Sequence, residues 1–431
     1  MKRLLTILML LAALVIAAPV LAQDGDDEPS PALVAELEQI EAAVSDMRGL
    51  PPLRPVTRLF PSRPAVIEFL AESFETEITD DEVFIATQFY RAFDFAGPDF
   101  DLETTYLQIM GDQVAGFYNP DTNEMNVILT GGGSLGDSLP PLEQVIYAHE
   151  YTHALQDQHF VLNLLDTIDE ADAQLAALAL VEGDATLVMQ RYMTASLAES
   201  GPAALLMLLA QSLLTEAEFP ADAPPILEAE LTMPYLDGLD FVTALYQQGG
   251  WDAVNAAFAD PPQATAQILH PERYLEGIEP GVVQVAAGEP VLGAGWELID
   301  EATLGEFYLR EYLGTQLAAR DAARAAAGWY GDRYRLYHHA GDDARAWVLH
   351  LAWDSEQDAA AFSDAYQTFA AARMAQDAAA SEPGALCWQG ADDALCLLDF
   401  SDDARTFIAY APSLELAAEM VAAQVDAVPQ P

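Results

Sequence analysis

The segment from Ile146 to Phe160, IYAHEYTHALQDQHF, constrains the fold of this chain more than any other part of its sequence. Within it, His149, Glu150 and His153 form the pattern H-E-x-x-H. Residues four apart on a helix lie on the same face and about one turn apart, so both imidazoles can reach one metal ion. The pattern therefore predicts a helix with two metal ligands, to which the fold must bring a third.

Glu150 has the position that a general base needs beside such an ion. It lies about 100° round the helix axis from His149, so its carboxylate falls beside the metal rather than on it. There it could take a proton from metal-bound water and later return it to the leaving group. The alternative is that His149 and His153 are ordinary core histidines, but the chain has only seven histidines, which makes a chance match rare.

His159 is one candidate for the third ligand, because metzincins place a third histidine at this spacing. In that group a glycine ends the helix after the second histidine and lets the chain return to the metal. Gln156 occupies the glycine position here and is a good helix former. If the helix continues, His159 lies about 15 Å beyond His149 along the axis, so it is kept only as the alternative ligand.

Glu182 is the preferred third ligand, because it interrupts the apolar helix predicted for ALALVEGDATLVM. A buried carboxylate without a partner costs several kcal/mol, and a metal ion held by two histidines would supply the missing positive charge. Gly183 beside it would let this helix approach the H-E-x-x-H helix closely. The alternative is an exposed carboxylate or an internal ion pair, although arginines are scarce in this segment.

Several segments around these residues resemble a group of exported bacterial proteins of gluzincin-like type. They are HEYTHALQDQHF, ALVEGDA, QILHPERY and the upstream AGFYNPDTNEMNV, and the similarity extends over about residues 112–274. The resemblance implies a zincin fold that binds one Zn2+ ion through His149, His153 and Glu182, with Glu150 as the catalytic base.

The resemblance leaves open which residues assist the metal ligands. Gluzincins of the thermolysin kind carry an aspartate four residues after the ligand glutamate, whereas this chain has Thr186. Another group must then orient a ligand imidazole, and Asp184 and Asp157 are the candidates. His270, in QILHPERY, could donate a hydrogen bond to the oxyanion of a tetrahedral intermediate. The alternative for His270 is an ordinary histidine at a helix end, before Pro271.

The charge of the chain excludes several partners. Asp and Glu outnumber Lys and Arg by 69 to 17, for a formal net charge of -52. Because nucleic acids and anionic membranes are bound by lysine and arginine, neither is expected as a partner. An acidic surface suits a protein dissolved in an extracellular or salty medium, and the alternative is a surface that attracts basic substrates.

The first residues have the pattern of a secretory signal peptide, with two basic residues before an apolar run that ends in small residues. We expect cleavage after Ala22, no membrane insertion of the remaining chain, and a secreted or other extracytoplasmic location. In such a compartment Cys387 and Cys396, the only cysteines, can form a disulfide across the hairpin predicted by ALCWQGADDALCLL.

We predict an α+β chain with a mostly helical, zincin-like metallopeptidase domain, a small β-hairpin or sheet, and a smaller α+β module. The hairpin is expected within residues 114–129, where a free strand edge could bind an extended peptide. Helices are expected at residues 31–48 before it and 301–327 after it. The expected organisation is a signal peptide (1–22), a leader and helix (23–60), the metallopeptidase domain (61–285), the C-terminal module with the disulfide hairpin (286–425) and a tail (426–431).

These features together predict an exported zinc metallopeptidase in which Glu150 assists the attack of zinc-bound water on a peptide bond. Its partner would be a peptide or protein substrate, and the sequence does not indicate an oligomeric state. A second hypothesis is a non-catalytic extracellular or cell-envelope binding protein on a zincin scaffold. Retention of Glu150 argues against it, because metal binding alone does not need a base. A third is hydrolysis of a non-peptide amide by the same chemistry.

Overall fold

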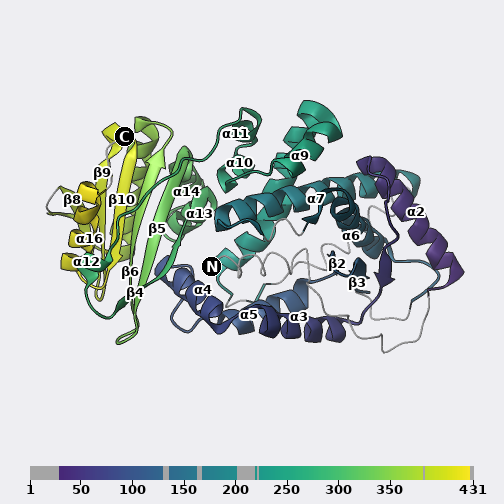
Figure 1. Ribbon diagram of the computed structural model, residues 1–431, viewed down its shortest axis with the longest axis horizontal. Helices are drawn as coiled ribbons and strands as arrows, with labels where there is room; N and C mark the ends of the chain where they lie inside the picture. Colours follow the sequence, from purple (N-terminus) through teal and green to yellow (C-terminus); the bar gives the residue numbers. More distant parts are fainter. Residues whose placement is uncertain are drawn as a thin grey trace.

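The computed structural model describes residues 29–129, 135–162, 167–200, 219–220, 223–381 and 384–427. It has an α+β architecture, with a helical part that contains a small sheet and a second part built on a larger sheet (Figure 1). The predicted signal peptide and the end of the predicted tail lie outside the described residues. Within the described ranges, no helix is long and apolar enough to cross a membrane.

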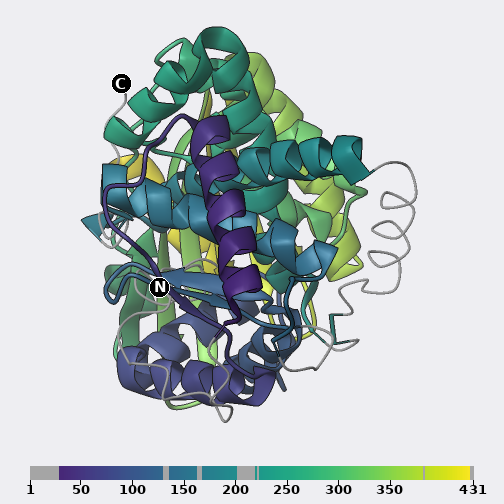
Figure 2. The same ribbon diagram turned by 90° about the vertical axis from the view of Figure 1, so that its right-hand side faces the viewer.

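The helical part precedes the larger sheet in the chain. Its helices are α2 (Pro31–Arg48), α3 (Arg63–Glu77), α4 (Asp80–Ala92), α5 (Leu102–Gln113), α6 (Pro141–Phe160), α7 (Ala171–Ser200), α9 (Pro225–Ala259), α10 (Thr265–Leu269) and α11 (Pro271–Leu275). Helix α7 packs against both α6 and α9, and α2 lies against α6 and α7 (Figure 2). The helix that carries the H-E-x-x-H pattern therefore packs against α2 and α7, and it also contacts strands of the small sheet.

Helix α2 has the bounds that the sequence predicts. Ser30 caps it by accepting a hydrogen bond from the amide of Leu33, and Gly49 ends it in the left-handed conformation. Its apolar stripe is buried in the same core cluster as residues of α6, among them Tyr147 and Leu155. Helix α2 is therefore part of the core around α6.

The predicted hairpin forms most of the small sheet, with strands β2 (Gly116–Asn119) and β3 (Glu124–Val127). A further strand, β1 (Thr57–Leu59), pairs in parallel with β3, so the strand order is β1-β3-β2. Asn119 stabilises the turn, because its side-chain oxygen accepts hydrogen bonds from the amides of Asp121 and Thr122. Strand β2 lies at the edge of this sheet, and its outer side has no strand partner among the described residues.

Seven antiparallel strands form the larger sheet, in the order β4-β5-β6-β10-β9-β8-β7. In chain order they are β4 (Trp296–Ala302), β5 (Trp329–His339), β6 (Ala344–Trp353), β7 (Ala379–Ser381), β8 (Ala385–Gln389), β9 (Ala394–Phe400) and β10 (Arg405–Ala411). The helices are α12 (Glu289–Leu292), α13 (Gly305–Gly314), α14 (Ala319–Ala326), α15 (Glu356–Met374), the 3-10 helix η2 (Ser401–Asp403) and α16 (Leu414–Ala427). Successive residues of β6 face opposite sides, so Val348 belongs to the core with α16, and Leu349 to the core with α15. Helices therefore cover both faces.

The prediction of a single helix over residues 301–327 is wrong. Residues up to Ala302 belong to β4, which pairs with β5, and α13 and α14 follow as separate helices. Gly305 begins α13 with a φ of +81°, a conformation that strongly favours glycine. Pairing with a strand distant in sequence outweighs the local helix propensity of the acidic residues in β4.

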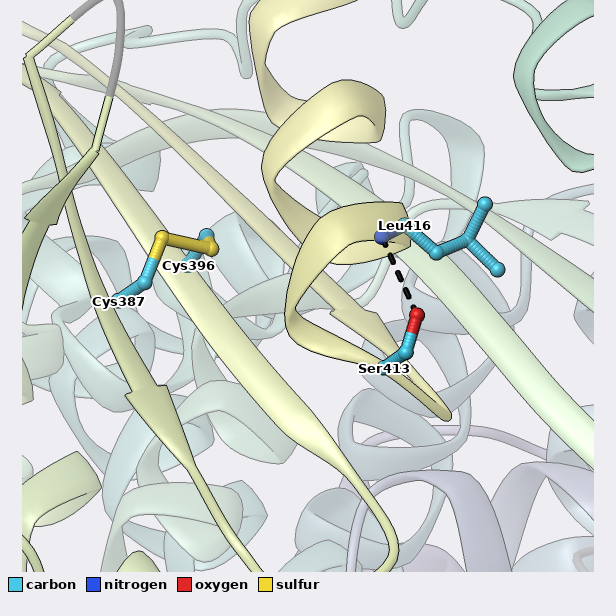
Figure 3. Close-up of a disulfide and its surroundings, with 4 residues drawn as sticks. All are labelled: Cys387, Cys396, Ser413 and Leu416. Carbon is cyan, nitrogen blue, oxygen red and sulfur yellow. Dashed lines mark hydrogen bonds between the residues drawn. A yellow bond between two sulfur atoms is a disulfide. The ribbon is translucent and has the colours of Figure 1, made fainter.

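The predicted disulfide joins Cys387 and Cys396 (Figure 3). The two cysteines are directly opposite each other on β8 and β9, and both are buried. Helix α16 begins nearby, where the hydroxyl of Ser413 accepts a hydrogen bond from the amide of Leu416. The bond therefore links the two strands of the hairpin expected from the sequence.

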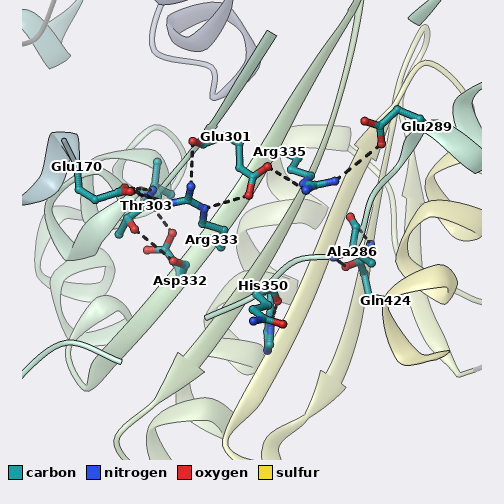
Figure 4. Close-up of polar contacts among 12 residues, drawn as sticks. Glu170, Ala286, Glu289, Glu301, Thr303, Asp332, Arg333, Arg335, His350 and Gln424 are labelled. Atoms are coloured by element: carbon teal, nitrogen blue, oxygen red, sulfur yellow. Dashed lines mark hydrogen bonds and ion pairs between the residues drawn. The ribbon is translucent and has the colours of Figure 1, made fainter. Parts of the chain in front are cut away.

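The helical part and the larger sheet share one hydrophobic core. Phe93, just after α4, stacks on Trp347 of β6 with ring centroids 4.9 Å apart. Arg333 on β5 forms ion pairs with Glu301 on β4 and with Glu170, just before α7 (Figure 4). The two segments on either side of residue 285 are therefore packed together rather than joined by a linker alone.

Candidate metal centre

Helices α6 and α7 bring the three predicted metal ligands together. His149 and His153 lie one turn apart on α6, and Glu182 lies on α7. The two histidine Nε2 atoms are 3.0 Å apart, and Glu182 Oε2 lies 3.1 Å from that of His149 and 3.5 Å from that of His153. All three side chains are buried, and their donor atoms are close enough together to hold one metal ion.

The charges in the centre favour a cation. Burial alone would lower the pKa of His153, but the Glu182 carboxylate, together with Glu150 and Gln156, outweighs burial and raises that pKa to about 9. Burial alone would raise the pKa of Glu182, but His153 and His149 outweigh it and lower that pKa to about 2. The fold therefore stabilises positive charge next to the Glu182 carboxylate.

A close contact between α7 and α9 shapes one side of the centre. A side-chain carbon added to Gly183 would lie 2.1 Å from the carbonyl oxygen of Gly238, and one added to Gly238 would lie 2.2 Å from that of Ala179. Only glycines allow the two backbones to approach in this way. The expectation that Gly183 brings its helix close to the H-E-x-x-H helix is corrected, because the glycine faces α9.

Tyr235 on α9 lies at the centre as a result of this crossing. Its ring stacks on the ring of His149, with centroids 5.9 Å apart. Burial raises the pKa of Tyr235 well above its ordinary value, and the nearby carboxylates of Glu182 and Glu150 raise it further. A hydrogen bond to the Glu182 carboxylate contributes to this shift, so the phenol keeps its proton at neutral pH and acts as a hydrogen-bond donor. In the sequence, the only signal for this contact is the pair of glycines, Gly183 and Gly238.

Glu150 is buried between the potential ligands and the edge strand β2. A side-chain carbon at Gly116 would lie 3.1 Å from Cγ of Glu150, so the strand comes very close to this carboxylate. Burial raises the pKa of Glu150, whereas the imidazoles of His149 and His153 lower it. The predicted base and the predicted peptide-binding edge therefore lie next to each other.

A glutamine, rather than either predicted aspartate, contacts His153. The Nδ1 atom of His153 lies 2.8 Å from Oε1 of Gln156. Gln156 in turn donates a hydrogen bond of 2.9 Å to Asp184. Asp184 therefore contacts His153 only through Gln156. Asp157 lies elsewhere and accepts hydrogen bonds from Arg54 and from the hydroxyl of Tyr118 on β2.

The imidazole of His149, the other potential histidine ligand, lacks a hydrogen bond of this kind among the described residues. His149 Nδ1 is buried without a hydrogen-bond partner among the described residues, and so is the hydroxyl of Thr186. Thr186 is the position at which the sequence departs from thermolysin-type gluzincins. The departure therefore coincides with a histidine whose Nδ1 atom contacts no carboxylate in the described part of the chain.

The two other histidines considered for the site have different partners. Helix α6 continues past Gln156, as predicted, and Nε2 of His159 lies 2.8 Å from the carbonyl oxygen of Pro51. His159, the alternative third ligand, is therefore not among the grouped donor atoms. His270 Nε2 lies 2.7 Å from Glu306 on α13, and this contact raises the pKa of His270. His270 lies between α10 and α11, and this contact links them to α13.

In comparisons with known proteins, the match found covers the part of the chain that forms the larger sheet and its helices. Residues 295–421 match the model of a domain of unknown function (DUF8575), which begins just before β4 and ends within α16. The searches of curated proteins and of solved structures found no match. The matched residues do not include those of the candidate metal centre.

Proposed function

We propose that this protein is an exported, zinc-dependent metallopeptidase of gluzincin-like type, and that its helical part is zincin-like. One observation carries the proposal: the donor atoms of His149, His153 and Glu182 converge, with the buried Glu150 carboxylate beside them. Export is supported by the signal-peptide pattern at the N-terminus and by the disulfide.

The donor set fits zinc. Two imidazole nitrogens and one carboxylate oxygen form the ligand set of many catalytic zinc sites, which keep a fourth position open. Ligand atoms about 2.0–2.2 Å from one tetrahedral ion lie roughly 3.3–3.6 Å from one another. The corresponding distances here are 3.0, 3.1 and 3.5 Å, so the side chains need to move only slightly.

The surrounding residues fit the hydrolysis of an amide. Zinc held in this centre would supply a Lewis acid that polarises the scissile carbonyl and acidifies the attacking water. Glu150 would accept the proton of that water and deliver it to the leaving amine. Tyr235 would donate a hydrogen bond to the oxyanion that develops on the carbonyl. The burial of both side chains strengthens these interactions by excluding water.

The edge of the small sheet supports a peptide as substrate. Strand β2 has no strand partner on its outer side among the described residues, and Gly116 at its start lies against Glu150. An extended peptide could add to this edge through main-chain hydrogen bonds, which would bring a peptide bond towards the centre. The proposed substrates are therefore extended or unfolded polypeptide segments.

The substitution Glu150→Gln tests this mechanism. The chain beginning at Gln23 is expected to bind zinc and to cleave an unfolded protein such as casein or a mixture of quenched peptides. Glu150→Gln should retain zinc but lose kcat by about 1,000-fold, since it removes the general base. Glu182→Ala should lose zinc. Glu143→Gln, a matched change on the same helix, and His159→Ala should keep both zinc and activity.

Three results would contradict the proposal. Peptidase activity that survives in Glu150→Gln would exclude this residue as the base. A parent protein that binds zinc but cleaves no peptide would favour the non-catalytic binding protein. Loss of zinc in His159→Ala, with zinc retained in Glu182→Ala, would show that the ligand assignment is wrong.

A further inference from the structure

A chain of buried polar side chains leads from His153 to the N-terminal helix. It consists of Gln156 on α6, Asp184 on α7 and Arg48 on α2, and each of them has 0% exposure. Burying a polar group costs free energy unless the group forms hydrogen bonds or ion pairs. A row of three buried polar side chains next to one potential metal ligand therefore calls for an explanation.

The contacts of Gln156 fix its orientation. Its Nε2 lies 2.9 Å from two acceptors, the carbonyl oxygen of Val181 and the carboxylate of Asp184. Only the amide nitrogen can donate to both, so Oε1 must face His153, whose Nδ1 lies 2.8 Å away. In the neutral imidazole that binds a metal ion, the proton then lies on Nδ1 of His153, which leaves the Nε2 lone pair free for the ion.

Gln156 also connects the two helices that carry the ligands. Val181, whose carbonyl accepts one of its hydrogen bonds, directly precedes Glu182 in α7. One amide group therefore orients His153 and holds the backbone next to Glu182. A change at Gln156 would disturb the positions of both ligands relative to each other.

Arg48 supplies the charge that lets Asp184 act as an acceptor in the core. Its Nε lies 2.7 Å from Oδ1 of Asp184, and its guanidinium lies 4.4 Å from the ring centroid of Trp251. A buried carboxylate requires such a cation. Arg48 is the last residue of α2, so its position depends on the packing of that helix against α6.

We propose that Gln156, Asp184 and Arg48 are positioning residues that orient His153 and set the metal affinity of the centre. The inference rests on the proposed function in taking His153 and Glu182 as metal ligands. It makes the N-terminal helix a part of the metal site, although α2 itself contributes no ligand.

Comparing Gln156 with a second glutamine of α6 distinguishes a role in positioning His153 from a purely structural role. Gln158 lies on the same helix, is also buried, and accepts hydrogen bonds from the amides of Leu53 and Arg54 at 2.6 and 3.1 Å. Gln158→Met and Gln156→Met therefore remove equivalent side chains from α6, but only the second faces a ligand. Both variants are compared with the parent chain beginning at Gln23.

The measurement is the zinc dissociation constant by chelator competition, together with the visible absorption of the Co2+-substituted protein. Gln156→Met should weaken zinc binding by about 10- to 100-fold and change the Co2+ spectrum. Asp184→Asn, which keeps an acceptor but removes the charge, should weaken zinc binding less. Gln158→Met should leave affinity within about 2-fold of the parent, even where it lowers the melting temperature.

Equal zinc affinity in Gln156→Met and Gln158→Met would overturn the proposal, as would an unchanged Co2+ spectrum in Gln156→Met. If Gln156→Met does not fold, Asp184→Asn decides by the same two measurements. This result is independent of the peptidase assay. If the parent binds zinc but cleaves nothing, only the proposed function is refuted. If the parent is active and the zinc affinity of Gln156→Met is unaltered, only the positioning role of Gln156, Asp184 and Arg48 is refuted.

Discussion

Two residues illustrate how a role can be assigned from neighbours and not from a motif. His270 stands in the segment QILHPERY, from which a catalytic role was predicted, yet its partner is Glu306. Tyr235 stands in no recognised pattern, yet it stacks on His149 and lies close to the carboxylates of Glu182 and Glu150. Under the proposed function, Tyr235 rather than His270 would therefore donate a hydrogen bond to the oxyanion.

Removing the Tyr235 hydroxyl tests this assignment. Tyr235→Phe keeps the ring against His149 but removes the donor, so kcat should fall by about 100-fold while KM and zinc content stay near the parent values. Tyr246→Phe on the same helix α9 removes an equivalent hydroxyl away from the centre and should change none of these. An unchanged kcat in Tyr235→Phe, measured by steady-state kinetics on a quenched peptide, would contradict the role.

At the scale of whole elements, the sequence predicted what local chemistry determines. Ser30, Pro31 and Gly49 define α2, and the helix propensity of Gln156 carries α6 past the point where a metzincin helix ends. The same sequence could not reveal β4, because that strand depends on pairing with β5. It could not reveal Tyr235 either, because its place depends on the crossing of α7 and α9. The features that the sequence did not predict therefore depend on contacts between residues distant in the chain.

The crossing of α7 and α9 gives a direct test at this scale. In Gly183→Ala the new carbon would lie 2.1 Å from the backbone oxygen of Gly238, so the helices must separate. We expect the free energy of unfolding to fall by about 3 kcal/mol, as for severe overpacking, and kcat to fall because Tyr235 moves away from His149.

A glycine at the surface of another helix provides the control for this change. Gly314→Ala in α13 meets no atom within 4 Å and should not destabilise the protein. Denaturant unfolding of the two variants measures the difference. Equal stability of Gly183→Ala and the parent would show that α7 and α9 are not held at this distance.

At the scale of the whole molecule, buried carboxyl groups lie where the helical part meets the larger sheet. Glu230 on α9 accepts hydrogen bonds from Tyr90 of α4 and Tyr308 of α13, at 2.8 and 2.7 Å. Burial raises the pKa of Glu230 to about 7, that of Asp172 to about 8 and that of Asp332 to about 6. In the unfolded chain these groups ionise near pH 4. The junction therefore binds protons that the unfolded chain releases.

These pKa shifts predict that stability increases as the pH falls from 8 to 6. A group whose pKa is raised by folding contributes its full stability below its unfolded pKa, and that contribution is lost as the pH rises through the folded value. For Glu230 the loss between pH 6 and pH 8 is about 1 kcal/mol. His350 opposes the trend, since burial lowers its pKa to about 4, but it is one group against three. The melting temperature of the parent should therefore rise by several degrees between pH 8 and pH 6.

Glu230→Gln separates this effect from the general repulsion within a chain of net charge -52. The glutamine oxygen can still accept from Tyr90 and Tyr308, but the side chain no longer titrates, so the melting temperature should depend less steeply on pH. Glu68→Gln removes the same charge from an exposed position on α3 and should keep the slope of the parent. Equal slopes in the two variants would mean that Glu230 does not contribute to the pH dependence, because each variant loses one carboxylate but only Glu230→Gln loses one at the junction of the helical part and the sheet.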